Sequence, residues 1–248
     1  GDQTYQWSPD SRWFLAKYIS VGGWNNTDIV LVKADGSGEM TNLTESGYSD
    51  DNPKWVLGGK AMIWSSDRAG YRSHGSWGAE DDVYIMFFDA EAYDKFNLSK
   101  EEFALLEEAE KEEKEAKEKD GKEDKDKKKD KKKADKDGKE DEAVEPLVFD
   151  LENRKDRVKR LTINSSHMGD AVLTPKGDKL YYCAAFEGGF DLWERNFREN
   201  STKLLIKNVG GGSMSIDKDG KYIRQERYAG AMSRSFYVGD VESKDVSA

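Results

Sequence analysis

The sequence is poor in the residues that build cross-links and metal sites. Cys183 is the only cysteine, so the chain cannot form a disulfide with itself. His74 and His167 are the only histidines, and no His-Glu-x-x-His sequence is present. No apolar run reaches the roughly 18 residues of a membrane span. We therefore expect no disulfide framework, no metal, no cofactor and no membrane span.

Positive charge is also in deficit. The 248 residues include 40 Lys and Arg against 50 Asp and Glu, a net charge of −10. A protein that binds nucleic acid needs a basic face, so nucleic acid is excluded as the main partner. The Lys-rich run 127–133 is the exception, and acidic residues lie close to it on both sides. We interpret that run as part of a solvated charged segment.

A short pattern recurs four times along the chain. Each copy has an aromatic, apolar or small residue, then a tight turn with Pro, Gly or Asp, then an apolar strand. The copies are residues 7–16, 55–64, 173–182 and 215–223. The third copy leads into the apolar run that contains Cys183, which predicts a buried structural thiol rather than a nucleophile.

A second shared pattern follows the first three copies. It is an apolar strand that begins with aspartate, at Asp28, Asp82 and Asp191. After the first of these strands, Asp35-Gly36 predicts a turn between strands three and four. Strands repeating at roughly 40 to 48 residues are typical of four-stranded propeller blades. The sequence therefore predicts an all-β fold, a partial β-propeller of about four four-stranded blades.

A charged segment interrupts the second blade. It opens with Ser99-Lys100-Glu101-Glu102, a capping box that predicts a helix over about residues 100–119. Beyond Glu110 it is almost entirely Lys, Glu and Asp, which predicts a disordered charged loop. The blade is expected to resume at residues 146–151 and to close with 158–162. The predicted organisation is blades 1 and 2 in residues 1–98, the insertion in 99–143, and the remaining blades in 144–248.

No catalytic residue is predicted in this chain. His74 and His167 lie in predicted loops with Ser and Asp nearby, but a triad is defined by geometry and not by neighbours in sequence. There is no Gly-x-Ser-x-Gly elbow. Ser65-Ser66-Asp67-Arg68 ends an apolar strand, and we interpret it as structural, with Asp67 bonding amides of its turn and pairing with Arg68.

These repeats resemble the propeller repeats of TolB and of tricorn proteases. The resemblance rests on Trp7-Ser8-Pro9-Asp10, on residues 28–32 and 35–38, and on Ser65-Ser66-Asp67-Arg68. It covers most of the chain outside the insertion and weakens in the last two blades. The inserted charged helix resembles that of bacterial tricorn-like serine peptidases.

The resemblance implies a noncatalytic part of a larger tricorn-like serine peptidase, acting as a scaffold or gate for peptide substrates. In that family the catalytic residues lie in a later domain, and no position here matches them. The alternatives are a TolB-like protein-interaction module and the propeller of a prolyl-oligopeptidase-type enzyme. The resemblance implies a periplasmic location, with the cytoplasm as the alternative. Gly1 opens no signal peptide, as in an excised segment.

The expected partners are a peptide or protein and the remaining domains of the parent chain. Loop residues at a channel mouth would contact an extended peptide, although these loops packing on a neighbouring blade is an alternative. The candidate contact residues are Tyr71, Arg72, His74, Trp77, His167 and Met168. Unpaired blade faces would be exposed, so self-association or additional blades are also expected.

Overall fold

The computed structural model describes residues 5–19, 26–72, 78–126, 145–226 and 233–237. The chain divides into two compact units. One unit comprises Gly1–Phe96 and Pro146–Ala248, and the other is Asn97–Glu145.

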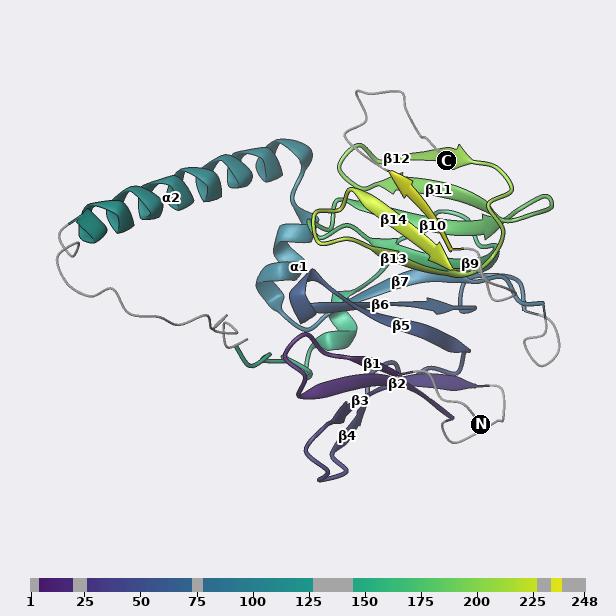
Figure 1. Cartoon of the computed structure of the whole chain (residues 1–248). Helices are drawn as coiled ribbons and strands as arrows, with labels where there is room; N and C mark the ends of the chain where they lie inside the picture. The colour runs from purple at the N-terminus through teal and green to yellow at the C-terminus, as the bar shows by residue number, and fades with distance from the viewer. Residues whose placement is uncertain (1–4, 20–25, 73–77, 127–144, 227–232, 238–248) are drawn as a thin grey trace. The chain divides into compact units, whose positions relative to one another are not determined.

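The described strands of the first unit form four antiparallel sheets, and in each sheet the strands follow one another in chain order (Figure 1). Blade 1 contains β1 (Tyr5–Trp7), β2 (Trp13–Ile19), β3 (Thr27–Lys33) and β4 (Met40–Asn42). Blade 2 contains β5 (Asp50–Val56), β6 (Ala61–Ser66), β7 (Asp82–Phe87) and β8 (Val158–Arg160). Blade 3 contains β9 (His167–Leu173), β10 (Lys179–Ala185), β11 (Asp191–Asn196) and β12 (Ser201–Ile206). Blade 4 has three described strands, β13 (Ser213–Ile216), β14 (Tyr222–Glu226) and β15 (Ser233–Tyr237).

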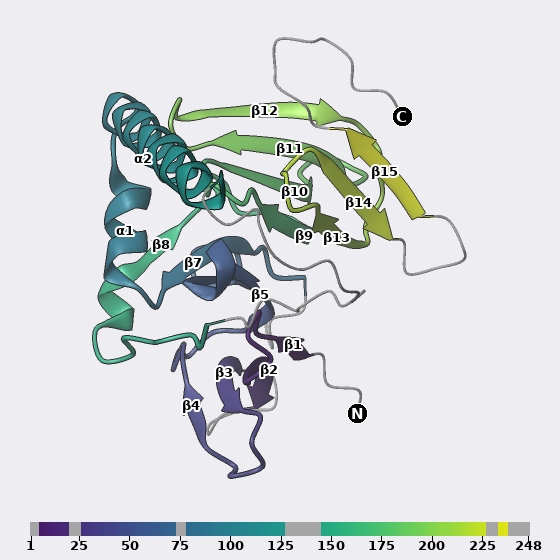
Figure 2. The same cartoon turned by 60° about the vertical axis from the view of Figure 1, so that its left-hand side comes forward.

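The repeated pattern therefore marks equivalent strands, as predicted. The strands expected to correspond are β2, β6, β10 and β14, and each is the second strand of its sheet. The Asp-initiated strands β3, β7 and β11 are each third. This arrangement confirms the prediction of a partial β-propeller, with four sheets arranged as successive blades (Figure 2).

A hydroxyl group fixes the first hairpin in two of the blades. The Trp13 amide donates to Ser8 Oγ at 3.0 Å, and the Lys179 amide donates to Thr174 Oγ1 at 3.1 Å. In each turn a carboxylate accepts the same hydroxyl, since Ser8 Oγ donates to Asp10 and Thr174 Oγ1 donates to Asp178. Side-chain bonds of this kind stabilise tight turns, so the polar residues of the repeat set where the second strand begins.

Apolar side chains are buried in three clusters between successive blades. Blades 1 and 2 enclose Leu15, Ile29 and Leu31 from one side and Met62 and Trp64 from the other. The second cluster, between blades 2 and 3, contains Ala61, Ile63, Val83, Ile85, Phe87, Leu173, Leu180 and Tyr182. The third, between blades 3 and 4, contains Tyr181, Cys183, Leu192, Met214 and Ile223. Cys183 is buried there, as predicted.

The charged insertion leaves blade 2 after β7 through a helix that the sequence did not suggest, α1 (Ala90–Asn97). The helix begins where the Ala92 amide donates to Asp89 Oδ1 at 2.7 Å. Phe96 lies against Phe87 of blade 2 and Phe197 of blade 3, with centroid distances of 5.2 Å to each ring. Arg198 donates to the carbonyls of Lys95 and Phe96, where a cation stabilises the end of a helix. Helix α1, which precedes the insertion, thus holds blades 2 and 3 together.

The second unit contains α2 (Lys100–Asp126). The predicted capping box is present, because the Glu102 amide donates to Ser99 Oγ at 3.2 Å and the Ser99 amide donates to Glu102 Oε2 at 2.9 Å. These bonds lower the pKa of Glu102. The helix continues seven residues beyond the predicted end. The expected charged loop lies outside the described residues.

The return from the insertion into blade 2 also differs from expectation. Residues 146–151 are not a strand. Instead Phe149 stacks on Trp55 with a centroid distance of 5.9 Å, and the Asp150 amide donates to the Phe88 carbonyl at 2.8 Å. The fourth strand is β8, and it pairs with β7.

Replacement of residues 107–141 by a short Gly/Ser linker is expected to leave the melting temperature within a few degrees of the parent. From Glu108 to Glu113 every side chain is exposed, so this part of α2 buries too little area to stabilise the fold. Arg198→Ala is the comparison variant, and we expect it to cost about 1–3 kcal/mol because two helix carbonyls lose a charged donor. Thermal unfolding followed by circular dichroism measures both. Loss of folding on linker replacement would contradict this expectation.

Candidate functional site

A polar cavity of about 370 Å³ lies between blades 2 and 3, beside the first residues of β9. Its lining residues come from β2, β5, β6, β7, β9 and the residue before β7. They are Lys17, Asp51, Asn52, Ile63, Trp64, Ser65, Asp81, Val83, Met168, Gly169, Asp170 and Ala171. The apolar members continue the core between blades 2 and 3, so the cavity has an apolar floor and polar walls.

Asp170, which lines the cavity, forms a buried ion pair with Lys54. Lys54 Nζ lies 2.5 Å from Asp170 Oδ2, and the Lys54 and Asp170 side chains are 17% and 2% exposed. Lys54 Nζ also donates to the carbonyls of Ala171 on β9 and Met214 on β13. Burial lowers the pKa of Lys54, and the Asp170 carboxylate opposes that effect. The pair joins the first strands of blades 2, 3 and 4.

Asp170 is held by further donors from the same strands. Asn52 Nδ2 donates to Oδ1 at 2.6 Å, and the Met214 amide donates to Oδ2 at 2.5 Å. The Ala171 amide donates to Oδ1 at 2.8 Å. These donors come from three different strands and hold the carboxylate in one position. Asp170 is therefore a fixed part of the wall.

The opposite side of the cavity carries a more exposed pair. Lys17 Nζ on β2 lies 2.8 Å from Asp51 Oδ2 on β5. Ser65 Oγ donates to the Asp51 carbonyl at 3.1 Å. Both charged side chains keep more than a third of their surface in solvent, so the pair can rearrange around a bound molecule at little cost.

Asp81 differs from the other carboxylates of the cavity in lying among like charges. Burial raises its pKa to about 6, and the charges of Asp67, Asp51 and Asp82 add to that effect. The only opposing influence among these causes is His167, at the start of β9. A positively charged group in the cavity would favour the ionised form of Asp81.

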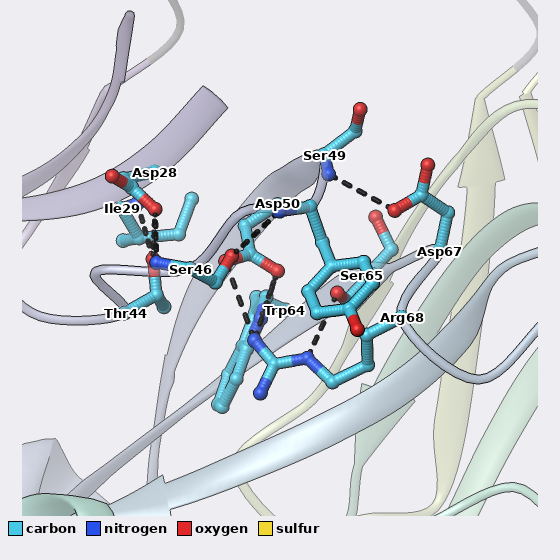
Figure 3. A network of polar contacts seen from close by, with 12 residues as sticks. Asp28, Ile29, Thr44, Ser46, Ser49, Asp50, Trp64, Ser65, Asp67 and Arg68 are labelled. Carbon is cyan, nitrogen blue, oxygen red and sulfur yellow. Dashed lines mark hydrogen bonds and ion pairs between the residues drawn. The ribbon is translucent and has the colours of Figure 1, made fainter. Parts of the chain in front are cut away.

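Behind the cavity, a network of buried polar groups fixes the start of β5 (Figure 3). Asp50 accepts from Trp64 Nε1 at 3.0 Å and from Ser46 Oγ at 2.6 Å. Arg68 Nη2 lies 3.1 Å from Asp50 Oδ1, and the guanidinium lies 4.7 Å from the Tyr84 ring centroid. Because Asp50 is held in this way, the backbone of the adjoining Asp51 is fixed at the cavity, while the Asp51 side chain remains free to rearrange with Lys17.

The Asp-initiated strands have a common structural role. Thr44 Oγ1 donates to Asp28 and accepts the Ile29 amide, and Thr162 Oγ1 makes the same pair of bonds with Asp82 and Val83. In blade 3 the Asn208 amide donates to Asp191 Oδ1 at 2.8 Å. These carboxylates hold the segment that follows the fourth strand, so they connect each blade to the next.

The interpretation of Asp67 needs a correction. The sequence suggested that it pairs with Arg68 and bonds amides of its own turn. In the structure Asp67 Oδ1 accepts the Ser49 amide at 3.0 Å, and Arg72 Nε lies 3.0 Å from Asp67 Oδ2. Arg68 is already held by Asp50. Ser49 lies in the connection between blades 1 and 2, so this connection orients the Asp67 carboxylate. With Arg68 bound to Asp50, the arginine that pairs with Asp67 is Arg72.

The candidate peptide-contact residues lie in different places. Met168 lines the cavity, and His167 is the exposed residue before it. Tyr71 is exposed, and its carbonyl accepts the Glu80 amide at 2.9 Å. Arg72 pairs with Asp67 and lies 5.0 Å from the Tyr48 ring centroid. His74 and Trp77 lie outside the described residues.

Sequence reasoning missed most of the polar lining of the cavity, namely Lys17, Asp51, Asn52, Ser65, Asp81 and Asp170. One indication was available. Asp51-Asn52 and Gly169-Asp170 occupy the same positions ahead of the pattern residues Trp55 and Leu173. Polar residues there resemble ordinary turn residues, so this indication carried little weight.

The described residues contain no group of three or more His, Cys, Asp and Glu side chains arranged to hold a metal ion. Burial raises the pKa of Cys183 to about 12, which keeps the thiol protonated. The cavity thus offers charge, hydrogen-bonding groups and an apolar floor, which suit binding. In the described part of the chain no helix has the length and apolar character to cross a membrane.

The fold places the chain among β-propeller proteins. No model of a known protein family matches the sequence, and no curated protein matches it either. Solved structures with a similar fold include TolB and the tricorn protease. TolB from Acinetobacter baumannii superposes with a TM-score of 0.50 and 16% identity, over 94% of this chain and 39% of TolB. The tricorn protease superposes with a TM-score of 0.54 and 9% identity, over 89% of this chain and 20% of the protease. The chain thus spans well under half the length of either protein.

Replacement of Lys54 by methionine is expected to destabilise the fold by about 3–5 kcal/mol, because it leaves the Asp170 charge buried without its cation. Lys17→Met removes a lysine of the same length from a solvent-exposed pair, so we expect a loss of about 1 kcal/mol or less. Urea unfolding measures both free energies. Equal losses of unfolding free energy in the two variants would show that the buried pair stabilises the fold no more than the exposed pair does.

Asp81→Asn is expected to change how stability depends on pH. The pKa of Asp81 is about 6 in the folded chain against 3.8 for the free side chain, so the folded chain binds this proton more tightly. Stability from this group is therefore present below pH 4 and lost as the pH rises to about 6. The asparagine variant lacks that loss. In urea unfolding, the free energy of unfolding of the variant relative to the parent should be higher at pH 7 than at pH 4.5. The same difference in free energy between variant and parent at both pH values would contradict the pKa assigned to Asp81.

Proposed function

We propose that this chain is a noncatalytic propeller module that binds extended polypeptide, as the scaffold or gate of a larger tricorn-like serine peptidase. The observation that carries the proposal is the polar cavity between blades 2 and 3. It opens where β9 begins, and it combines fixed charges, an adjustable ion pair and an apolar floor.

These features suit an extended peptide better than a compact ligand. Strand ends at a propeller mouth offer backbone groups beside side chains, so a peptide backbone and its side chains can be bound together. Met168 supplies a flexible apolar contact that adapts to different side chains. Asp81 would accept a positively charged peptide group. Tyr71 and His167 are exposed residues available to extend the contact.

Catalysis is assigned to other domains of the parent protein. The thiol of Cys183 is buried and protonated, and the described residues of the cavity present no nucleophile held by a base. The similarity to the tricorn protease supports the peptidase assignment only at the level of fold, since the chain spans 20% of that protein. A periplasmic location belongs to the same proposal and rests on the resemblance to TolB.

A TolB-like interaction module is the second candidate. The observation that favours it is the superposition on TolB, which extends over 94% of this chain. The two candidates differ in the ligand. A gate binds many unrelated extended peptides weakly, whereas an interaction module binds one folded protein more tightly than its peptides.

Fluorescence anisotropy with labelled extended peptides tests the proposal. We expect weak binding that is stronger for Lys- and Arg-containing peptides than for neutral peptides of the same length. Asp81→Asn should reduce that preference, because it removes the negative charge and keeps the shape of the side chain. Asp156→Asn is the matched control, since Asp156 is exposed and is not among the residues that line the cavity. Equal effects of the two variants would contradict binding at the cavity.

Fluorogenic versions of the same peptides test the absence of catalysis. We expect no turnover above buffer from the purified chain. Steady hydrolysis that His167→Ala abolished would contradict the noncatalytic assignment. If neither turnover nor binding is found, the peptide-gate proposal fails and the interaction module is the surviving candidate.

A further inference from the structure

The face of blade 1 that points away from blade 2 is strongly aromatic. Tyr5 and Trp7 of β1 are 58% and 53% exposed. Their rings and that of Phe14 on β2 contact one another edge to face, with centroid distances of 5.7 to 6.5 Å. We call this set, together with Val32 and the buried residues Ala16 and Val30, the outer face of blade 1; Ala16 and Val30 are 9% and 2% exposed, so Tyr5 and Trp7 form its open part. Strand pairing places all six on one side of the sheet.

The internal repeat shows what covers such a face. Phe14 occupies the position of Met62 in blade 2 and Leu180 in blade 3, and both of those residues are fully buried. Met62 packs in the cluster between blades 1 and 2, and Leu180 in the cluster between blades 2 and 3. In both blades, then, this position is covered by the blade that precedes it.

A second pair of equivalent positions gives the same answer. Trp7 corresponds to Trp55 of blade 2 and Leu173 of blade 3. Trp55 packs with the cluster between blades 1 and 2, and Leu173 is 4% exposed in the cluster between blades 2 and 3. Trp7 is the one member of the three that lies largely in solvent.

The other end of the array does not match this face. In β13 and β14, four side chains point toward blade 3, namely Met214, Ile216, Ile223 and Gln225. Strand pairing places the remaining described side chains of these two strands on the opposite side. They are Ser213, Ser215, Tyr222, Arg224 and Glu226. Arg224 and Glu226 form an ion pair at 2.9 Å on that side. Packing this polar surface on aromatic rings would bury charge, so blade 4 of a second copy is a poor occupant.

We propose that the outer face of blade 1 is a docking surface for a further propeller blade with an apolar forward face. The forward face of a blade is the side that packs on the next blade along the chain. In blade 1 this side presents apolar residues to blade 2, namely Leu15, Ile29, Leu31 and Leu43, and the proposed occupant would present similar residues to blade 1. Stacked repeats gain stability from each neighbouring interface, so an added blade of this kind should order itself on blade 1.

The test is a tandem chain, in which a copy of residues 5–49 precedes the full chain. In the copy, Tyr5 and Trp7 are changed to serine, so that oxidation of Trp7 reports only on the original blade. Hydroxyl-radical footprinting with mass spectrometry should show Trp7 oxidised several-fold more slowly in the tandem chain than in the parent. The control tandem carries Leu15→Lys and Leu31→Lys in the copy, and its Trp7 should react as in the parent.

A second tandem with a copy of residues 165–212 repeats the measurement with blade 3 as the added blade. It keeps the proposal testable if the first copy does not become ordered. Unchanged Trp7 oxidation in both tandems would overturn the proposal. Sedimentation of the parent chain tests the competing occupant, because a dimer that Trp7→Ser converts to a monomer would show that a second copy covers the face and the proposal is wrong.

Discussion

The buried pair of Lys54 and Asp170 is the interaction on which the arrangement of the blades depends. In a repeat protein each unit normally contacts only its neighbours, and the apolar clusters of this chain follow that rule. Lys54 is different, since it reaches from blade 2 to a carbonyl of blade 4 while pairing with a carboxylate of blade 3. Such a contact constrains the angle between blades more tightly than apolar packing, because hydrogen bonds are directional. Asp170 also lines the cavity, so this residue contributes both to the cavity and to the arrangement of the blades.

Carboxylates recur at the connections between blades, because hydrogen bonds within a sheet do not fix the position of one blade relative to the next. Asp28 and Asp82 occupy the same place in two blades and fasten the chain as it leaves the fourth strand. Asp50 adds a buried connection through Arg68 and Trp64. The acidic composition of the chain is thus in part structural. Asp81 is different, because burial and neighbouring carboxylates raise its pKa and only the nearby His167 lowers it. It is therefore the carboxylate best placed to respond to a bound cation.

The sequence was sufficient to predict the repeated second and third strands of the blades, because their determinants are local, whereas the strand expected at residues 146–151 is absent. The turn at Ser8–Ser11 and the apolar strand after it are encoded within ten residues, and the same is true of the capping box at Ser99. Helix α1 was missed although Asp89 begins it, because its apolar residues Tyr93 and Phe96 find their partners on blades 2 and 3. The cavity was harder still. Lys17, Asp51 and Asp170 are far apart in sequence, and only the packing of three blades brings them together. The expected pairing of Asp67 with Arg68 was wrong because Arg68 is held by Asp50 of another strand, and Asp67 pairs with Arg72 instead.

The position of the insertion also affects the order in which the chain folds. β7 ends at Phe87 and its partner β8 begins at Val158, so roughly 70 residues separate two strands that lie side by side. Closing so long a connection costs about 3 kcal/mol more than a two-residue hairpin would. During synthesis β7 emerges several seconds before β8, at roughly 5–20 residues per second. In that interval blade 2 has an unpaired edge, and α1, which is complete soon after β7 and packs on Phe87, is the first element that can shield that part of the blade.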